Sequence, residues 1–138
     1  MKIQFRKASE NDVQVLGQMN KRLIEDEGHS NPMNVDELTE RMKGFLNNEY
    51  TAYLIIANGT LSGYCLFRDD WDYVYVRHLF VERTSRHTGL GSTCIRWLKN
   101  NLWANRKVRI EVLCHNDSGI AFWRKIGFRD YSITMEMQ

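Results

Sequence analysis

A strand followed by a glycine-containing loop and a helix constrains this chain more than any other feature. The stretch begins with the apolar residues 79–81, continues through a polar loop and enters a helix at Gly89-Leu90-Gly91. The two glycines lack Cβ atoms, so the backbone there can approach a bulky group closely. The first N–H groups of the helix have no acceptor inside the helix and carry partial positive charge. With Arg86 nearby, these donors predict a site for an anion such as phosphate.

The other elements follow from the spacing of apolar residues and from turn and capping residues. We expect strands over 3–8, 50–57, 61–68, 73–81, 108–113 and 128–137, and helices that begin near Ser9, at Asn34, at Gly91 and after Asn116. Asn58-Gly59 predicts a tight hairpin, so strands two to four should form an antiparallel meander. The strand that follows the third helix should lie parallel to the strand ending at Val81. The sequence therefore predicts an α/β (α+β) fold with a mixed, mostly antiparallel sheet in the order β-α-α-β-β-β-α-β-α-β.

Composition excludes several classes of protein. The chain has 138 residues, which suits a single domain over 1–138 with a core of its own. Its net charge is +2 and its basic residues are dispersed, which argues against a nucleic-acid partner. No apolar run approaches the roughly 18–20 residues of a membrane span. The three cysteines show no metal-binding spacing and suit reduced thiols, so we expect a cytoplasmic protein without a metal.

Two known phosphate-binding motifs are alternatives for this loop. A P-loop requires Gly-Lys-Ser/Thr after its glycine, and no such run is present. A dinucleotide fingerprint is closer, because Gly89-x-Gly91 is followed 20 residues later by Glu111. The third glycine of that fingerprint is Cys94 here, and no second half of a doubly wound sheet follows. A nucleotide-dependent oxidoreductase therefore stays an unfavoured alternative.

A second motif lies downstream of the loop. Asn116 is followed by the run Ala121-Phe122-Trp123-x-Lys125-x-Gly127-Phe128. Together with Arg86-x-x-Gly89-x-Gly91 and the order of elements, this run resembles the GNAT superfamily of acyl-CoA-dependent N-acetyltransferases over essentially the whole chain. The resemblance implies the GNAT fold with a splayed pair of parallel strands. It also implies transfer of an acetyl group from acetyl-CoA, as co-substrate, to an amine by direct attack in a ternary complex.

The resemblance also implies a cofactor site. Its residues would be Leu79, Phe80, Val81, Arg86, His87, Thr88, Gly89, Leu90, Gly91, Ser92, Asn116, Phe122 and Trp123. In relatives the loop wraps the CoA pyrophosphate through backbone N–H groups, and the strand matching 79–81 splays at a bulge. The exposed main chain of that strand pairs with the pantetheine arm, and one of its amides polarises the thioester carbonyl. Asn116 matches a residue that contacts pantetheine, although it also suits a helix N-cap.

The catalytic residues are less well defined, because Trp123 stands where many relatives have a tyrosine that protonates the leaving thiolate. An indole N–H is not acidic enough for that role. Its substitutes would be Tyr73, Tyr75 or Tyr131. His78, two residues before the expected bulge, is a candidate general base because an imidazole has a pKa suited to neutral pH, although an ordinary strand histidine is the alternative. The catalytic candidates are His78, Tyr75 and Asn116.

The acceptor is a small-molecule or peptide amine that the sequence does not identify. Glu25, Glu27 and His29 precede the connector that helps wall the acceptor site in relatives, and their charge would attract a cationic amine, although a solvated helix end explains them as well. A GNAT-fold module that binds acyl-CoA without catalysis is the alternative that Trp123 favours. Relatives often dimerise, but no stripe of side chains marks a dimer face, so a homodimer and a monomer both stay open.

Overall fold

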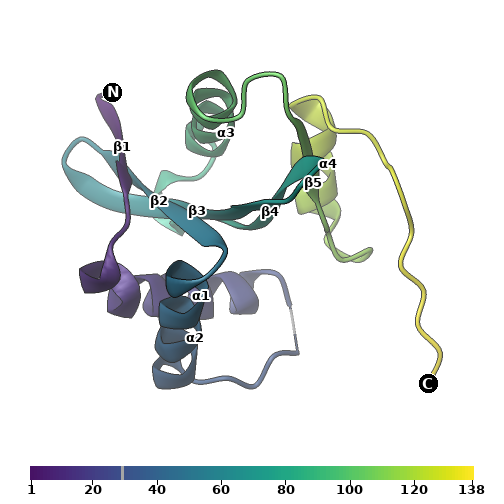
Figure 1. Ribbon diagram of the computed structural model, residues 1–138, viewed down its shortest axis with the longest axis horizontal. Helices are drawn as coiled ribbons and strands as arrows, with labels where there is room; N and C mark the ends of the chain where they lie inside the picture. The colour runs from purple at the N-terminus through teal and green to yellow at the C-terminus, as the bar shows by residue number, and fades with distance from the viewer. Residues whose placement is uncertain (29) are drawn as a thin grey trace.

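The computed structural model describes residues 1–28 and 30–138 and is built around a five-stranded sheet in the order β1-β2-β3-β4-β5. The strands are β1 (Ile3–Lys7), β2 (Tyr50–Ala57), β3 (Thr60–Asp69), β4 (Tyr73–Val81) and β5 (Lys107–Ile110). The first four are antiparallel, and β5 pairs with β4 in parallel. Figure 1 shows α1 and α2 on one face of the sheet, α3 on the other, and α4 beside β5. The fold class and the meander are as the sequence predicts.

Helix α2 (Val35–Asn47) begins at its predicted cap, whereas α1 (Val13–Asp26) begins four residues after Ser9. A single 3-10 turn, η1 (Glu10–Asp12), carries the Ser9–Asp12 capping box and leads into α1. The Asn34 side chain accepts a hydrogen bond from the Glu37 backbone at the start of α2. Buried side chains of the two helices and the sheet form one core, consisting of Leu16, Met19, Leu23, Met42, Tyr50, Ala52, Leu54, Tyr64, Leu66 and Phe80.

Helix α3 (Leu90–Asn101) forms the second core with the opposite face of the sheet. This core contains Ile55, Ala57, Cys65, Phe67, Val74, Val76, Leu90, Cys94, Ile95, Leu98 and Trp103. Side chains of β5 and of α4 (Asp117–Lys125) pack against its border. Over residues 1–28 and 30–138, no helix is both long and apolar enough to cross a membrane.

The strand β4 is irregular where it passes β3. Leu66 pairs with His78 and Phe67 pairs with Val76, so Arg77 is an extra residue on β4. Such a bulge bends the strand and increases its twist. The bulge therefore lies just before His78, whereas the sequence placed His78 two residues before it.

The predicted last strand, 128–137, is wrong for this chain taken alone. No strand follows α4 among the described residues, and β5 ends at Ile110 instead of Leu113. The apolar side chains at alternate positions of the C-terminal segment are 76–96% exposed, namely Tyr131, Ile133, Met135 and Met137. Figure 1 shows this yellow segment running away from the body of the molecule. The alternation indicates strand character, but a strand also needs a partner edge, which the segment does not find within its own chain.

Candidate active site

The parallel strands β4 and β5 separate part-way along β4. Their pairing runs from Tyr73 opposite Lys107 to Val76 opposite Ile110. Beyond this point β4 continues to Val81, while the chain after β5 turns away towards α4. Within residues 1–28 and 30–138, the β4 backbone over 77–81 therefore has no strand partner on the side of β5. In open sheets, ligands bind beyond the carboxyl ends of parallel strands, and this is such a place.

The loop after β4 brings free N–H groups to the same end of the sheet. After the 3-10 turn η2 (Arg83–Ser85), the backbone is left-handed at His87 and again at Gly89, and α3 then begins. The first N–H bonded within α3 is that of Thr93, which donates to the Gly89 carbonyl at 2.9 Å. The N–H groups at 90–92 precede this bond, and the first turn carries no acidic side chain. These donors and the positive helix end suit an anion.

Arg86 does not act as the free cation that the sequence suggested. Its Nε donates to the Val81 carbonyl at 2.8 Å, and its guanidinium also contacts Asp26 at the end of α1. Arg83 binds the same carboxylate at 2.6 Å. Burial tends to raise the pKa of Asp26, but the hydrogen bonds from Arg86 and Arg83 outweigh it and lower that pKa. Arg86 thus fastens the loop to β4 and α1, which leaves backbone N–H groups as the donors for the predicted anion site.

Glycine is required at positions 89 and 91 of the loop for different physical reasons. Gly89 has φ +81°, a left-handed conformation that suits glycine, and nothing lies within 4 Å of where its Cβ would be. Gly91 is buried, and a Cβ there would lie 3.2 Å from Cζ of Phe122 and 3.7 Å from Cδ2 of Leu79. The prediction that both glycines admit a bulky ligand is therefore not supported at Gly91, where the missing side chain makes room for α4.

Helix α4 positions the residues of the downstream motif. Its N-cap is Asn116, whose Oδ1 accepts a hydrogen bond from the Gly119 backbone at 3.1 Å. Phe122 lies against the start of α3, and the Trp123 ring is 5.0 Å from both Phe122 and Phe128, edge to face. Trp123 thus packs on the α3 core. The contacts of Asn116 and Trp123 with CoA stay predictions.

His78 lies on the α2 side of β4, where its Nδ1 is 3.0 Å from the Tyr64 hydroxyl. Burial, and to a lesser extent the positive charges of Arg41 and Arg77, lower the pKa of His78 to about 3. The general-base prediction relied on a pKa near neutrality, and the structure corrects that premise. At neutral pH this imidazole is uncharged and has little affinity for a proton.

Tyr75 makes a contact across the point where the strands separate. Its hydroxyl donates to Oε1 of Glu111 at 2.6 Å, and Glu111 is the exposed residue that directly follows β5. Burial and the hydrogen bond to Glu111 raise the pKa of Tyr75 above its ordinary value, which makes it a weaker proton donor. From the sequence, Glu111 was interpreted only as the possible ribose ligand of a dinucleotide fingerprint. Its position at the end of a parallel strand was the signal that could have placed it at this site.

The other tyrosine candidates, Tyr73 and Tyr131, both contact Arg109. Arg109 is stacked over the rings of Tyr73 and Tyr131, at 4.1 Å and 4.4 Å, and it donates a hydrogen bond to the Tyr131 hydroxyl. Tyr73 is the first residue of β4, whereas the strands separate after Val76. Tyr75 is therefore nearer to the separation than Tyr73 along β4.

The C-terminal end of α1 lies beside the loop that joins β5 to α4. The Glu27 carbonyl is 3.3 Å from Nε2 of His115, in the loop that joins β5 to α4. Glu25 is exposed, and His29 lies outside the described residues. Within those residues, no group of three or more His, Cys, Asp or Glu side chains is placed to hold a metal ion. The structure therefore brings Glu27 beside the loop that borders the separated strands, while the acceptor role of this cluster stays a prediction.

Residues 18–128 match the model of the acetyltransferase (GNAT) family, which is well over half of the chain. The chain belongs to the GNAT acetyltransferase family. No curated protein matches it.

Solved structures show the same fold. A possible acetyltransferase from Clostridium difficile 630 has a TM-score of 0.83 at 15% identity, covering 100% of this chain and 97% of that one. A predicted acetyltransferase from Clostridium acetobutylicum, solved with acetyl-CoA, has a TM-score of 0.78 at 21% identity, covering 99% and 96%. The PaiA N-acetyltransferase from Thermoplasma acidophilum, solved in complex with coenzyme A, has a TM-score of 0.78 at 17% identity, covering 97% and 94%. Because the chain belongs to the GNAT family, the alternative of a nucleotide-dependent oxidoreductase is not favoured.

Proposed function

We propose that this protein is an N-acetyltransferase that moves the acetyl group of acetyl-CoA to an amine by direct attack in a ternary complex. The observation that carries the proposal is the continuity between the unpaired edge of β4 and the free N–H groups at the start of α3. A ligand that carries a diphosphate at one end and an extended, amide-containing arm at the other would complement these two features. Its diphosphate would suit the N–H groups of α3, and its arm would suit the edge of β4. The GNAT structures solved with acetyl-CoA or coenzyme A support this choice of ligand.

The backbone would do most of the positioning. The N–H groups at 90–92 would hold the pyrophosphate, and the β4 edge over 77–81 would pair with the pantetheine amides as an added strand. A β4 amide directed at the thioester oxygen would stabilise the negative charge that develops there. The amine nitrogen then forms the new C–N bond, the C–S bond breaks, and the electron pair leaves with sulfur as CoA thiolate. The attacking nitrogen loses one proton.

We assign the handling of that proton to the exposed carboxylate of Glu111 and the water around it. Glu111 lies where β5 leaves β4, and its hydrogen bond from Tyr75 fixes one carboxylate oxygen. His78 is the weaker candidate because its low pKa disfavours protonation. Glu25 and Glu27, on the side of α1, would add to the attraction of a cationic small-molecule or peptide amine.

Two measurements test the proposal. Calorimetric titration with acetyl-CoA should show saturable binding, and release of free thiol should follow when an amine from a broad panel is added. No binding at high micromolar acetyl-CoA would refute the assignment. Binding without turnover on any amine would favour the non-catalytic acyl-CoA module instead.

A matched pair of variants tests the role of the carboxylate. Glu111→Gln should lower kcat with little change in acetyl-CoA binding, whereas Glu49→Gln, an exposed carboxylate between α2 and β2, should leave both unchanged. Equal rates for the two variants would remove Glu111 from the mechanism without affecting the assignment of the cofactor.

A further inference from the structure

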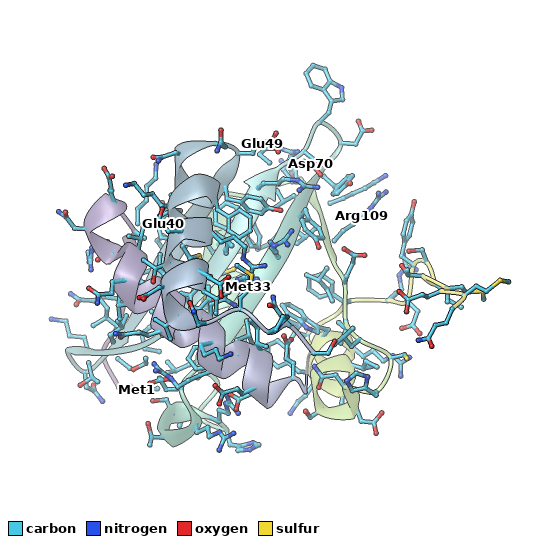
Figure 2. The ribbon with its side chains drawn as sticks, turned by 90° about the horizontal axis from the view of Figure 1, so that it is seen from below. Met1, Met33, Glu40, Glu49, Asp70 and Arg109 are labelled. Carbon is cyan, nitrogen blue, oxygen red and sulfur yellow. The ribbon has the colours of Figure 1, made fainter. Side chains whose placement is uncertain are left out.

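Two arginines on the α2 side of the sheet have no acidic partner. Among residues 1–28 and 30–138, no carboxylate forms an ion pair with Arg41 or Arg77. Their guanidinium groups lie 5.3 Å and 4.9 Å from the centroid of the Phe45 ring in α2. The neighbouring Arg68 differs, because it is paired with Asp70 at 2.7 Å. Figure 2 looks onto α1 and α2 and shows Asp70 on the side of the C-terminal end of α2.

Part of this unpaired charge is withdrawn from water. Nη2 of Arg41 donates a hydrogen bond to Oδ1 of Asn20 in α1, at 2.9 Å. Within the part of the chain that the structure describes, Nε of Arg41 and Nδ2 of Asn20 are buried and have no hydrogen-bond partner. Burial, and then the charge of Arg77, lower the pKa of Arg41 below its ordinary value, but a guanidinium stays charged in proteins. A cation that is partly desolvated without a counter-ion costs free energy, and binding of an anion would offset that cost.

The bulge of β4 directs Arg77 towards this place. Neighbouring side chains of a regular strand point to opposite faces of the sheet. Here Arg77 lies over Phe45, and the ring of the next residue, His78, is 6.5 Å from the same Phe45 ring. Both side chains face α2 because Arg77 is the extra residue of the bulge. Bulges next to active sites commonly redirect a side chain in this way.

The same arginines are close to the candidate active site. Arg77 is the first residue beyond the point where β4 and β5 separate. The Tyr50 hydroxyl accepts hydrogen bonds from Arg77 at 3.4 Å and from Arg68 at 2.8 Å. The Arg68 guanidinium in turn lies 4.8 Å from the centroid of the Tyr75 ring, and the Tyr75 hydroxyl binds Glu111. Tyr75 and Arg77 are two residues apart on β4, which is about 6–7 Å of strand, so one small molecule can extend from the site to the arginines.

We propose that Arg77 and Arg41 bind a carboxylate of the acceptor, so that the substrates are amines that also carry a carboxylate, as amino acids do. This inference rests on the proposed acetyltransferase function, because it assigns the acceptor of that reaction. A guanidinium matches a carboxylate with two parallel N–H···O bonds. The exposed Arg77 would make these bonds, and the half-buried Arg41 would add its charge. The amine of the same molecule would then lie towards Glu111 and the unpaired edge of β4.

Pairs of amines that differ in the carboxylate provide the first test. Thiol release from acetyl-CoA is measured for a panel of amino acids and for the matching amino-acid amides. The pair that is turned over fastest should show a kcat/KM at least tenfold higher for the acid than for the amide. Phosphoethanolamine and ethanolamine form a further pair, which distinguishes a phosphate from a carboxylate.

The outcomes of this assay separate the two proposals. Turnover at equal rates within every amino-acid pair, or a preference confined to phosphoethanolamine, would overturn the inference and leave the acetyltransferase assignment intact. Absence of both acetyl-CoA binding and turnover would refute the assignment, and the inference with it.

A matched pair of variants tests the role of Arg77. Arg77→Gln should raise KM for the acid at least tenfold and bring the acid-to-amide ratio of kcat/KM close to one, while the dissociation constant of acetyl-CoA stays within twofold. Arg77→Lys should restore part of the ratio, because an ammonium keeps the charge without the paired N–H groups. Arg6→Gln, at an exposed arginine of β1 on the opposite edge of the sheet, should leave the ratio unchanged. An unchanged ratio in Arg77→Gln would overturn the inference.

Binding can also be measured without turnover, in the unmodified protein. Glutarate, a dicarboxylate without an amine, is titrated while the arginine Nε–H signals are followed by NMR, and the signal that Arg77→Gln removes identifies Arg77. The signals of Arg77 and Arg41 should shift and saturate at millimolar glutarate, whereas sodium chloride at equal ionic strength should shift them much less. Shifts confined to other arginines, or none at tens of millimolar glutarate, would overturn the inference.

Discussion

Replacing Gly91 by valine should destabilise the protein without directly affecting the binding of CoA. The position of its missing Cβ is 3.2 Å and 3.3 Å from two ring atoms of Phe122 and 3.7 Å from a methyl group of Leu79. These distances leave little room for one carbon atom and none for the two γ-methyl groups of valine. The added atoms would therefore push α4 away from α3.

Overpacking of this kind costs about 1–3 kcal/mol, and the close ring contact places Gly91→Val near about 2 kcal/mol. For a chain of this length that corresponds to a fall in Tm of roughly 6–10 °C. Gly91→Ala should cost less, about 1 kcal/mol, because the Phe122 ring can move by a few tenths of an ångström. Urea unfolding followed by tryptophan fluorescence measures both values.

A double-mutant cycle checks the cause. Phe122→Leu removes the ring atoms that the valine would meet, so Gly91→Val should cost about 1 kcal/mol less in that background. Below its melting temperature, folded Gly91→Val should bind acetyl-CoA within about threefold of the unchanged protein, a difference under 1 kcal/mol. Full stability together with lost binding would show that Gly91 faces the ligand and would refute this reasoning.

Three further outcomes are expected. Gly89→Ala should lower the stability by about 1–2 kcal/mol because of its φ of +81°. Gly44→Ala, in the last turn of α2 with nothing within 4 Å of the added Cβ, should raise the stability by about 0.5–1 kcal/mol. Equal effects of the two changes in urea unfolding would contradict the backbone argument. The pKa of His78 is about 3 in the folded state against an ordinary 6.5, so the unfolded chain binds the extra proton between these values. Stability should therefore fall as pH drops from 6.5 towards 3, by at most about 1.4 kcal/mol per pH unit, and His78→Asn should flatten that slope in urea titrations repeated across pH. Asp26→Asn should lower the free energy of unfolding by about 1–2 kcal/mol at neutral pH, because it weakens the contacts with two loop arginines. Glu25→Gln, at the neighbouring exposed position, should leave the free energy of unfolding nearly unchanged in the same assay.

Much of the candidate site could be predicted from the sequence, but the interaction partners and pKa values of several of its side chains could not. The loop, the left-handed Gly89 and the free N–H groups follow from local sequence, because a helix start exposes its own donors. The sequence could not show that Arg86 is engaged by Asp26, since 60 residues separate the two along the chain. The pKa of His78 likewise depends on burial and on Arg41 in α2, which no local pattern encodes.

The sequence by itself determined the helices, the hairpin and the order of the strands. Asn58-Gly59, the Asn34 cap and the period of the apolar residues act over a few residues, so local chemistry fixes them. Only the tertiary structure decided where β4 and β5 separate, why Gly91 must be small, and what becomes of the last strand. These three features depend on contacts between segments that are distant in the sequence. A segment of alternating apolar and polar residues, such as 131–138, becomes a strand only where an unpaired strand edge lies beside it, and in this fold the segment does not lie along one.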